Sequence, residues 1–122
     1  MRTPIKSSYR GYTLFTMPPA SSGGITMTET LNILENFAPL PPFGSVQYTH
    51  LLTEAYRRSF TDRNEKLGDP AFIKVPLEQL TSKDYAKTLA MVKQIATDAG
   101  IISSPVDETK VVDTTYISAL VP

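Results

Sequence analysis

One short stretch of this sequence has the residue types of a self-activating nucleophile. Asp113, Thr114 and Thr115 stand in a row, after a segment of linker composition. A threonine that chain cleavage makes N-terminal carries its own base, because its α-amine lies beside its Oγ hydroxyl. On residue types alone, a β-branched pair such as Thr114-Thr115 is interpreted first as part of a strand.

Other side chains with catalytic potential have simpler structural interpretations. Asp62 and Asp69 are candidates for general acid or base chemistry, but no spacing selects a converging pair. Capping or surface positions at helix ends are therefore the preferred interpretation of both. His50, the only histidine of the chain, is expected to be packed or half-exposed on a helix.

The sequence predicts no metal and no cofactor. It contains no cysteine, which excludes disulfides, thiolate catalysis and cysteine-ligated zinc. A single histidine cannot form a metal site by itself.

A glycine-serine loop offers a further candidate for ligand binding. In Ser21-Ser22-Gly23-Gly24, successive backbone N–H groups at a helix N-terminus could form an anion-binding nest. The preferred interpretation is a turn in which the serines cap backbone N–H groups and the glycines permit close backbone approach.

Length and charge limit the classes of function. The chain has 122 residues, enough for one compact domain with a core. Twelve Lys and Arg balance twelve Asp and Glu, so no long-range field would gather nucleic acid, and no nucleic-acid partner is predicted. The first residues lack the apolar run of a secretory signal, and no stretch approaches the roughly 20 apolar residues that span a bilayer.

Strand and helix signals alternate in the first third of the chain. Residues Tyr12 to Met17 alternate apolar side chains with threonine and stop at Pro18-Pro19, which predicts a short strand. A helix is expected to begin at the glycine-serine loop and to end before Pro39. Its predicted core-facing stripe consists of Met27, Leu31, Leu34 and Phe37.

Two further helices are predicted downstream. The longer runs from about Ser45 to about Lys66, and its charged last turns are interpreted as a solvated end. Its apolar positions at helical spacing are Tyr48, Leu51, Leu52, Ala55, Tyr56 and Phe60. The residues from Leu67 to Pro70 supply a glycine turn and a proline stop. The next helix extends from about Ser82, a plausible N-cap, to Asp98. Its apolar positions in register are Tyr85, Leu89, Val92 and Ile95.

The remaining residues are predicted to form a linker and a strand. Residues 100–110 have linker composition, and the run from Val111 to Val121 is rich in β-formers. The fold class is therefore α/β (α+β), mainly helical, and its two predicted strands do not form an obvious complete sheet.

Three stretches, in this order and spacing, resemble the gamma-glutamyltranspeptidase family. They are Tyr9-Arg10-Gly11-Tyr12, Met17-Pro18-Pro19-Ala20-Ser21-Ser22-Gly23-Gly24, and Leu31-Asn32-Ile33-Leu34-Glu35-Asn36-Phe37. Glu54-Ala55, Asp62-Arg63, Leu67-Gly68-Asp69-Pro70 and Tyr85-Ala86-Lys87 continue the resemblance, which covers about residues 4–118.

The resemblance implies a fragment of an N-terminal nucleophile hydrolase of αββα fold, made as one precursor that cuts itself into two subunits. Thr114 would be the catalytic nucleophile, and the bond between Asp113 and Thr114 would be the cleavage site. Tyr116 stands where the family usually has histidine, and Ala20 replaces a proline. The implied partners are glutathione and other γ-glutamyl compounds, acceptor amino acids or peptides, and the remaining parts of the large and small subunits.

The resemblance also implies a division of the chain. Residues 1–99 would be the C-terminal helical part of the large subunit, 100–113 a linker to the processing site, and 114–122 the start of the small subunit. The family implies a periplasmic, secreted or membrane-anchored extracellular location, although the chain itself does not indicate its compartment. Its substrate-binding arginine, oxyanion-hole glycines and paired serines fall on no residue here, so the chain alone is expected to be inactive. Two alternatives stay open: a non-catalytic relic or small interaction domain, and an acylase of the same superfamily.

Overall fold

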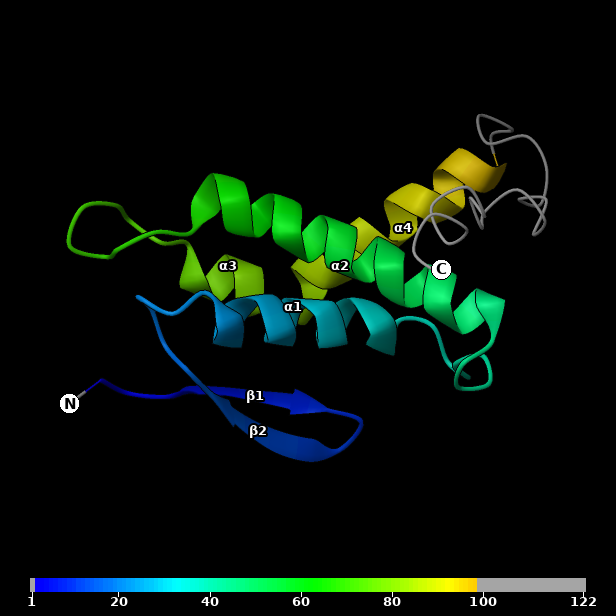
Figure 1. Ribbon diagram of the computed structural model, residues 1–122, viewed down its shortest axis with the longest axis horizontal. Helices are drawn as coiled ribbons and strands as arrows, with labels where there is room; N and C mark the ends of the chain where they lie inside the picture. Colours follow the sequence, from blue (N-terminus) through cyan, green and yellow to red (C-terminus); the bar gives the residue numbers. More distant parts are fainter. Residues whose placement is uncertain (1, 99–122) are drawn as a thin grey trace, which may run out of the picture.

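The fold is a β-hairpin packed on a layer of helices. The computed structural model describes the backbone of residues 2–98 and the side chains of residues 2–91. Within this part, the elements are β1 (Ile5–Tyr9), β2 (Tyr12–Thr16), α1 (Gly23–Glu35), α2 (Val46–Lys66), α3 (Leu77–Thr81) and α4 (Lys83–Asp98). Helix α1 lies between the hairpin and the other helices (Figure 1). The mainly helical α/β class is therefore confirmed.

The hairpin is closed by a two-residue turn. Strands β1 and β2 are antiparallel, and Tyr9 pairs with Tyr12 across the turn. Arg10 and Gly11 have φ values of 48° and 85°, the left-handed conformation that such turns require. The predicted strand at Tyr12 is confirmed, but β1 was not predicted, because its polar Lys6, Ser7 and Ser8 do not give an apolar strand pattern.

Helix α1 is covered on both sides, which corrects one prediction. Ile33 and Leu34 are buried as expected of a core helix, but so are polar residues such as Thr28 and Asn32. Met27, which was predicted to face the core, is 46% exposed. A helix enclosed between two layers buries most of its circumference, so a single apolar stripe does not identify its buried residues.

Helix α2 begins and ends as predicted, and its predicted stripe is correct in part, because Ala55 is buried and Leu51 and Leu52 pack against the core. Ser45 is the N-cap, and its hydroxyl accepts a hydrogen bond from the backbone N–H of Tyr48. Tyr56 and Phe60, which were placed in the predicted stripe, are each 47% exposed. The fully buried positions are Ala55, Ser59 and Asp62. Small side chains at the first two positions allow α1 and α2 to approach closely.

The contact between α1 and α2 includes a buried hydroxyl pair. The Thr30 hydroxyl donates to Ser59 Oγ at 2.9 Å, and the Ser59 hydroxyl donates to the Ala55 carbonyl at 3.0 Å. Both side chains are thus satisfied without water, as buried polar groups require.

The last two helices meet at Ser82. The short α3 was not predicted, because five residues are too few to show a helical period. Helix α4 was predicted within one residue, and Ser82 accepts a hydrogen bond from the Tyr85 N–H as an N-cap does. The side chains of Val92 and Ile95 and the predicted strand from Val111 to Val121 lie outside the described part.

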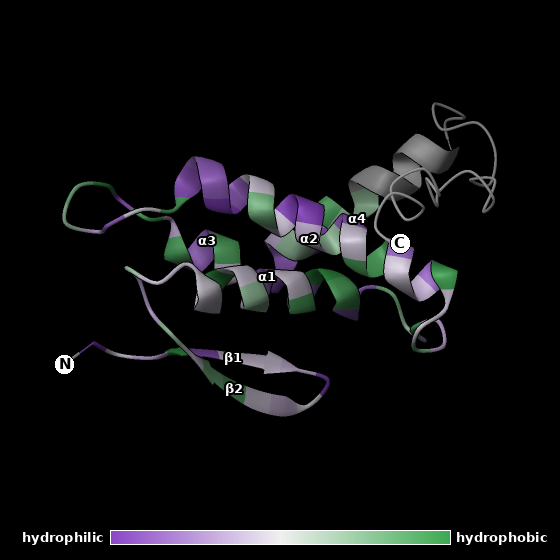
Figure 2. Cartoon of the chain, in the orientation of Figure 1, coloured by the Kyte–Doolittle hydropathy of each residue, from purple (hydrophilic) through white to green (hydrophobic). Residues whose placement is uncertain are grey.

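Two apolar clusters form the core, one at the C-terminal half of α1 and one at its N-terminal half. One contains Ile33, Leu34, Ala55 and Ala86, against which Phe37, Leu51, Leu52 and Leu89 pack. The other contains Ile5, Ile25 and Leu80, with Leu67, Val75, Leu77 and Tyr85 at its edge. The C-terminal part of α2, by contrast, is strongly hydrophilic (Figure 2). The second cluster is what joins the hairpin to α3.

Removing the Leu80 side chain is expected to destabilise the fold. Leu80 is completely buried, so Leu80→Ala loses apolar burial and leaves a cavity, at a cost of roughly 2 to 3 kcal/mol. This value is at the low end for Leu→Ala, because half-buried Leu67 and Val75 can partly fill the space. Urea unfolding measures the change. Phe72→Ala is the control, since that larger side chain is 86% exposed and its loss should leave the unfolding midpoint unchanged.

Candidate functional site

The predicted nucleophile lies outside the part of the chain that the structure describes. Neither Asp113 nor Thr114 can be placed relative to the helices, and their roles stay predictions. The described residues instead contain a loop cavity, a buried ionisable cluster and an exposed ion pair.

The glycine-serine loop packs tightly against the end of β2. A Cβ atom at Gly24 would lie 2.1 Å from the Met17 carbonyl oxygen, so only glycine fits there. The Ser21 hydroxyl accepts a hydrogen bond from the Gly23 N–H at 3.3 Å. Ser22 is the residue before α1, and its hydroxyl accepts from Arg63 Nε at 3.1 Å and makes no capping bond. These contacts support the turn-and-cap interpretation, with Ser21 as the serine that caps.

A surface cavity of about 290 Å³ adjoins this loop. It is lined by Pro19, Ala20, Ser21, Ser22, Ile25, Arg63, Asn64, Leu67, Gly68 and Val75. Its cationic group, Arg63, also donates to Asn64 Oδ1 at 2.9 Å, so the guanidinium is held by neutral oxygens and no carboxylate contacts it in the described structure. The cavity therefore combines one cation with a largely neutral lining.

The most unusual group of ionisable residues lies between α1, α2 and α4, with two buried carboxyl groups and two half-buried partners. Asp62 accepts hydrogen bonds from Lys66 Nζ at 2.6 Å and from the Tyr85 hydroxyl at 2.6 Å. Lys66 Nζ also donates to the Tyr85 hydroxyl oxygen at 2.7 Å. Glu29 of α1 is 1% exposed, and its carboxyl group interacts with that of Asp62. We call these four residues the acid cluster.

Burial and mutual contact shift the pKa values of the two carboxyl groups in opposite directions. Burial, the hydrogen bond to Asp62 and the charge of Asp62 raise the pKa of Glu29 to about 8. Burial alone would raise the pKa of Asp62, but hydrogen bonds from Lys66, Tyr85 and Glu29 hold it below its usual value. Two carboxyl groups can share a hydrogen bond only when one carries the proton, so Glu29 is the neutral donor and Asp62 the charged acceptor.

The acid cluster corrects the interpretation of Asp62. This residue was predicted to cap a helix or face solvent, but it is 6% exposed and belongs to a network across three helices. The charged end of α2 is therefore solvated only in part. Asp69 does behave as expected, because it is exposed and its Oδ1 accepts from the Ala71 N–H at 2.9 Å. His50 is exposed on α2, which corrects the expectation that it is packed or half-exposed.

Sequence reasoning missed Glu29, although a signal was available. Glu29 follows Ile25 by four residues and precedes Ile33 by four, so it shares their face of the helix. Because both isoleucines are buried, a carboxyl group between them must be buried as well. A group that could accept a hydrogen bond from this carboxyl group, or neutralise its charge, had to come from another element.

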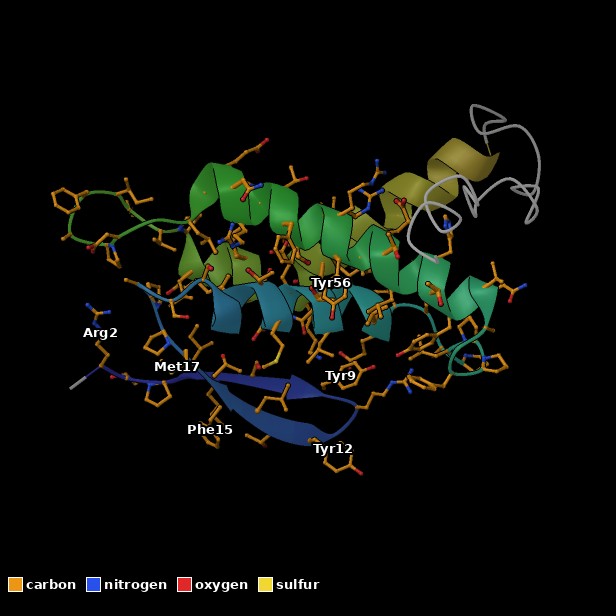
Figure 3. The ribbon with its side chains drawn as sticks, viewed as in Figure 1. Arg2, Tyr9, Tyr12, Phe15, Met17 and Tyr56 are labelled. Carbon is orange, nitrogen blue, oxygen red and sulfur yellow. The ribbon has the colours of Figure 1, made fainter. Side chains whose placement is uncertain are left out.

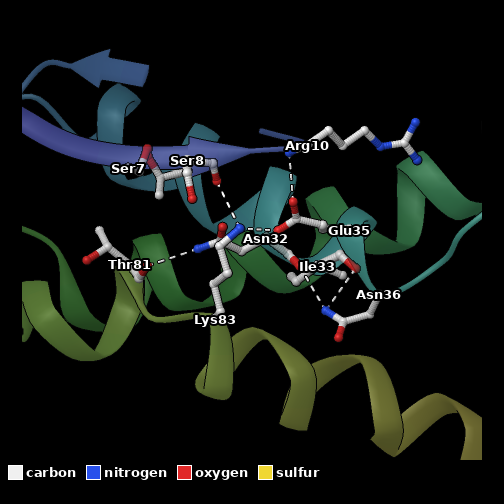
Figure 4. Close-up of polar contacts among 10 residues, drawn as sticks. Ser7, Ser8, Arg10, Asn32, Ile33, Glu35, Asn36, Thr81 and Lys83 are labelled. Atoms are coloured by element: carbon white, nitrogen blue, oxygen red, sulfur yellow. Dashed lines mark hydrogen bonds and ion pairs between the residues drawn. The ribbon is translucent and has the colours of Figure 1, made fainter. Parts of the chain in front are cut away.

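A second ionic contact joins the hairpin to α1 and α4 (Figure 4). Glu35 forms an ion pair with Lys83, whose Nζ also donates to the Ser8 carbonyl at 2.9 Å. The Arg10 backbone N–H donates to Glu35 Oε1 at 2.7 Å. The bonds from Lys83 and Arg10 lower the pKa of Glu35. This contact is partly exposed, so it positions the hairpin more than it stabilises it.

In the described residues, no group of three or more His, Cys, Asp or Glu side chains could hold a metal ion. Across residues 2–98, no helix is both long and apolar enough to cross a membrane.

Comparisons with known proteins give one consistent match. The sequence model of the family described as Gamma-glutamyltranspeptidase matches residues 1–120, a range that includes Asp113 and Thr114. The Glutathione hydrolase proenzyme of Escherichia coli (strain K12) is 51% identical over 90 residues, which are 73% of this chain and 16% of that protein. The Acylase ACY 1 proenzyme of Pseudomonas sp. (strain SE83) is 47% identical over 87 residues, covering 70% of this chain and 16% of the relative.

A solved structure is similar over most of the chain. The Helicobacter pylori gamma-glutamyltranspeptidase structure superposes with a TM-score of 0.72 and 33% sequence identity, covering 89% of this chain and 30% of that one. The chain therefore spans less than a third of the length of the proteins it matches here.

Proposed function

Because this chain belongs to the gamma-glutamyltranspeptidase family, we propose that it is part of an enzyme that cleaves glutathione and transfers its γ-glutamyl group to water, an amino acid or a peptide. The observation that carries the proposal is the family match, which extends through Thr114. As proposed, residues 1–99 belong to the large subunit, 100–113 link to the processing site, and 114–122 begin the small subunit.

The proposed chemistry begins with cleavage of the precursor. Thr114 Oγ adds to the Asp113 carbonyl carbon, the Asp113–Thr114 C–N bond breaks, and the Asp113 acyl group moves to Oγ as an ester. Water then opens the ester, which leaves a carboxylate on Asp113 and a free α-amine on Thr114. That amine is the base that the nucleophile needs.

The catalytic cycle then uses the same two groups. The Thr114 α-amine takes the proton from Oγ as the oxygen attacks the γ-glutamyl carbonyl, and the leaving amine receives that proton when its C–N bond breaks. Water or an acceptor amine attacks the resulting γ-glutamyl ester and restores the threonine. An N-terminal nucleophile hydrolase thus needs no metal or organic cofactor for this reaction.

Exposed apolar side chains on the hairpin support the proposal that further polypeptide packs on this chain. Tyr12, Phe15 and Met17 are 74%, 69% and 65% exposed, and Figure 3 shows Tyr12 and Phe15 pointing away from the helices. Contiguous exposed apolar residues are typical of surfaces that are covered in an assembly. The rest of the large and small subunits would supply that cover.

An acylase acting on another amide is a second candidate, which the relative named Acylase ACY 1 proenzyme favours. The nucleophile and the order of bond changes would be the same. Only the groups that recognise the acyl part would differ, and hydrolysis rates for γ-glutamyl and other acyl anilides would separate the two candidates.

The proposal is tested by transplanting the segment. The purified 122-residue chain is expected to release no chromophore from a γ-glutamyl anilide, because the implied substrate-binding arginine and oxyanion donors are absent from it. A missing oxyanion hole alone costs about 3 to 4 kcal/mol of barrier. Residues 1–120 placed in the E. coli proenzyme, in exchange for the segment that aligns with the same part of the family model, are expected to give a cut and active protein. Hydrolysis by the isolated chain, or an uncut and inactive but folded graft, contradicts the proposal.

A further inference from the structure

Glu29 and Asp62 are two buried carboxyl groups that interact across the contact between α1 and α2. Glu29 is 1% and Asp62 6% exposed, and they belong to α1 and α2 respectively. Glu29 Oε1 is buried without a hydrogen-bond partner, and the Glu29 carboxyl group interacts with that of Asp62. Removing the shared proton would leave two buried negative charges that repel each other, and the Glu29 carboxylate would be poorly solvated.

We propose that the acid cluster is a pH-sensitive contact between helices, which we call the lock. A proton held between Glu29 and Asp62 keeps α1 packed against α2 and α4, and this proton is released as the solution becomes alkaline. Asp62 is the fixed anion of the lock, because Lys66 and Tyr85 both donate to it. Glu29 is the group that gains and loses the proton. The lock concerns folding and not the chemistry proposed for Thr114.

The neighbouring elements bring no other buried charge to Glu29. Within the described residues, the charges that act on it are those of Asp62 and Lys66. Apart from Tyr9 and Tyr85, the ionisable side chains on β1, on α3 and in the first turn of α4 are exposed. They are Lys6, Glu78, Lys83 and Asp84. Nothing on these elements therefore replaces the proton when it leaves.

The sign of the pH dependence follows from the direction of the shift. The pKa of Glu29 is about 8 in the folded chain and 4.5 for a glutamate without these contacts. Between these two pH values, folding therefore takes up one proton. Stability is then fully present below the lower value and falls as pH rises toward the upper one, after which it levels off. Asp62 and Lys66 do not change charge in this interval, because one pKa is lowered and the other raised.

Urea unfolding as a function of pH tests the lock. For the wild-type chain, the folding equilibrium constant should fall by up to about tenfold per pH unit between about pH 5 and pH 8, the limit for one proton. Glu29→Gln keeps the shape of the side chain and can donate an N–H to Asp62 without a proton that titrates. This variant should lose most of the slope and be more stable than wild type at the alkaline end.

Glu35→Gln is the matched control, because it is the same substitution on the same helix. The pKa of Glu35 is lowered, so its carboxylate is charged in both states over this interval and its removal should leave the slope unchanged.

A direct titration guards against a variant that fails to fold. In wild-type chain labelled with ¹³C at the glutamate carboxyl groups, one resonance should titrate several pH units above the others. An equal slope in Glu29→Gln and wild type, or titration of every glutamate in the ordinary acidic range, would overturn the proposal.

Discussion

Thr114→Ala in the grafted proenzyme is expected to leave one uncut polypeptide with no measurable γ-glutamyl anilide hydrolysis. The substitution removes the only atom proposed to attack both the Asp113 carbonyl and the substrate. Loss of a catalytic nucleophile costs roughly 10³-fold or more in rate, and here it also prevents the α-amine from forming. Intact-mass measurement should therefore show one chain in the variant and two in the parent graft.

The energetic reason for the double loss is that one residue serves two reactions. An amide resists attack by a neutral hydroxyl, so self-cleavage requires the scissile peptide to be held in a strained conformation. Once cleavage has occurred, the same hydroxyl gains an adjacent base. This mechanism therefore predicts no activity in a chain that has not been cleaved.

Thr114→Ser provides the control, since serine keeps the hydroxyl and the capacity to form an N-terminal amine. It should yield two chains, the smaller beginning at residue 114, and retain measurable hydrolysis. Cleavage at the same bond in Thr114→Ala would show that Thr114 is not the nucleophile and that Thr114-Thr115 is an ordinary strand pair.

Gly24→Ala is expected to cause a large loss of stability. The added Cβ would lie 2.1 Å from the Met17 carbonyl oxygen, 2.7 Å from the Met17 nitrogen and 2.9 Å from Thr16 Oγ1. Two of these atoms belong to the backbone and cannot rotate away, so the end of β2 must separate from α1. We expect a net cost of about 3 kcal/mol or more, even after a gain of up to about 1 kcal/mol in helix propensity.

Gly23→Ala is a closely matched control for this effect. It makes the same change one residue earlier in the same helix, where the nearest atom to the added Cβ is Ser21 Oγ at 3.6 Å. This variant should be as stable as wild type or slightly more stable in urea or thermal unfolding. Equal stability of the two variants would mean that the contact between the loop and Met17 does not constrain the fold.

The sequence by itself determined the elements whose signals are local. The helices from Val46 and from Lys83 follow from apolar periodicity and from Ser45 and Ser82, whose capping hydroxyls are within three residues of the N–H groups they accept from. The end of α2 follows from the glycine and proline after Leu67. Such signals survive in a single sequence, because both partners lie within one or two turns of each other.

Motif resemblance reached further than periodicity in the candidate site. The predicted family was confirmed by the match over residues 1–120. The roles of Asp113 and Thr114 stay predictions, because these residues lie outside the part that the structure describes. The sequence could nominate them only through their place in a family pattern, since a threonine pair alone resembles any strand.

Only the tertiary structure decided which polar residues are buried. Glu29 and Asp62 are 33 positions apart, and each has an ordinary place on its own helix until α1 packs on α2. Likewise, β1 gains its strand character from pairing with β2, and Met27 becomes exposed because the hairpin and the helices cover other sides of α1. Desolvation of a charged group depends on what packs around it from distant parts of the chain. Local periodicity therefore predicted where helices begin and end. The proton shared by side chains of α1 and α2 could be inferred only from the packed fold.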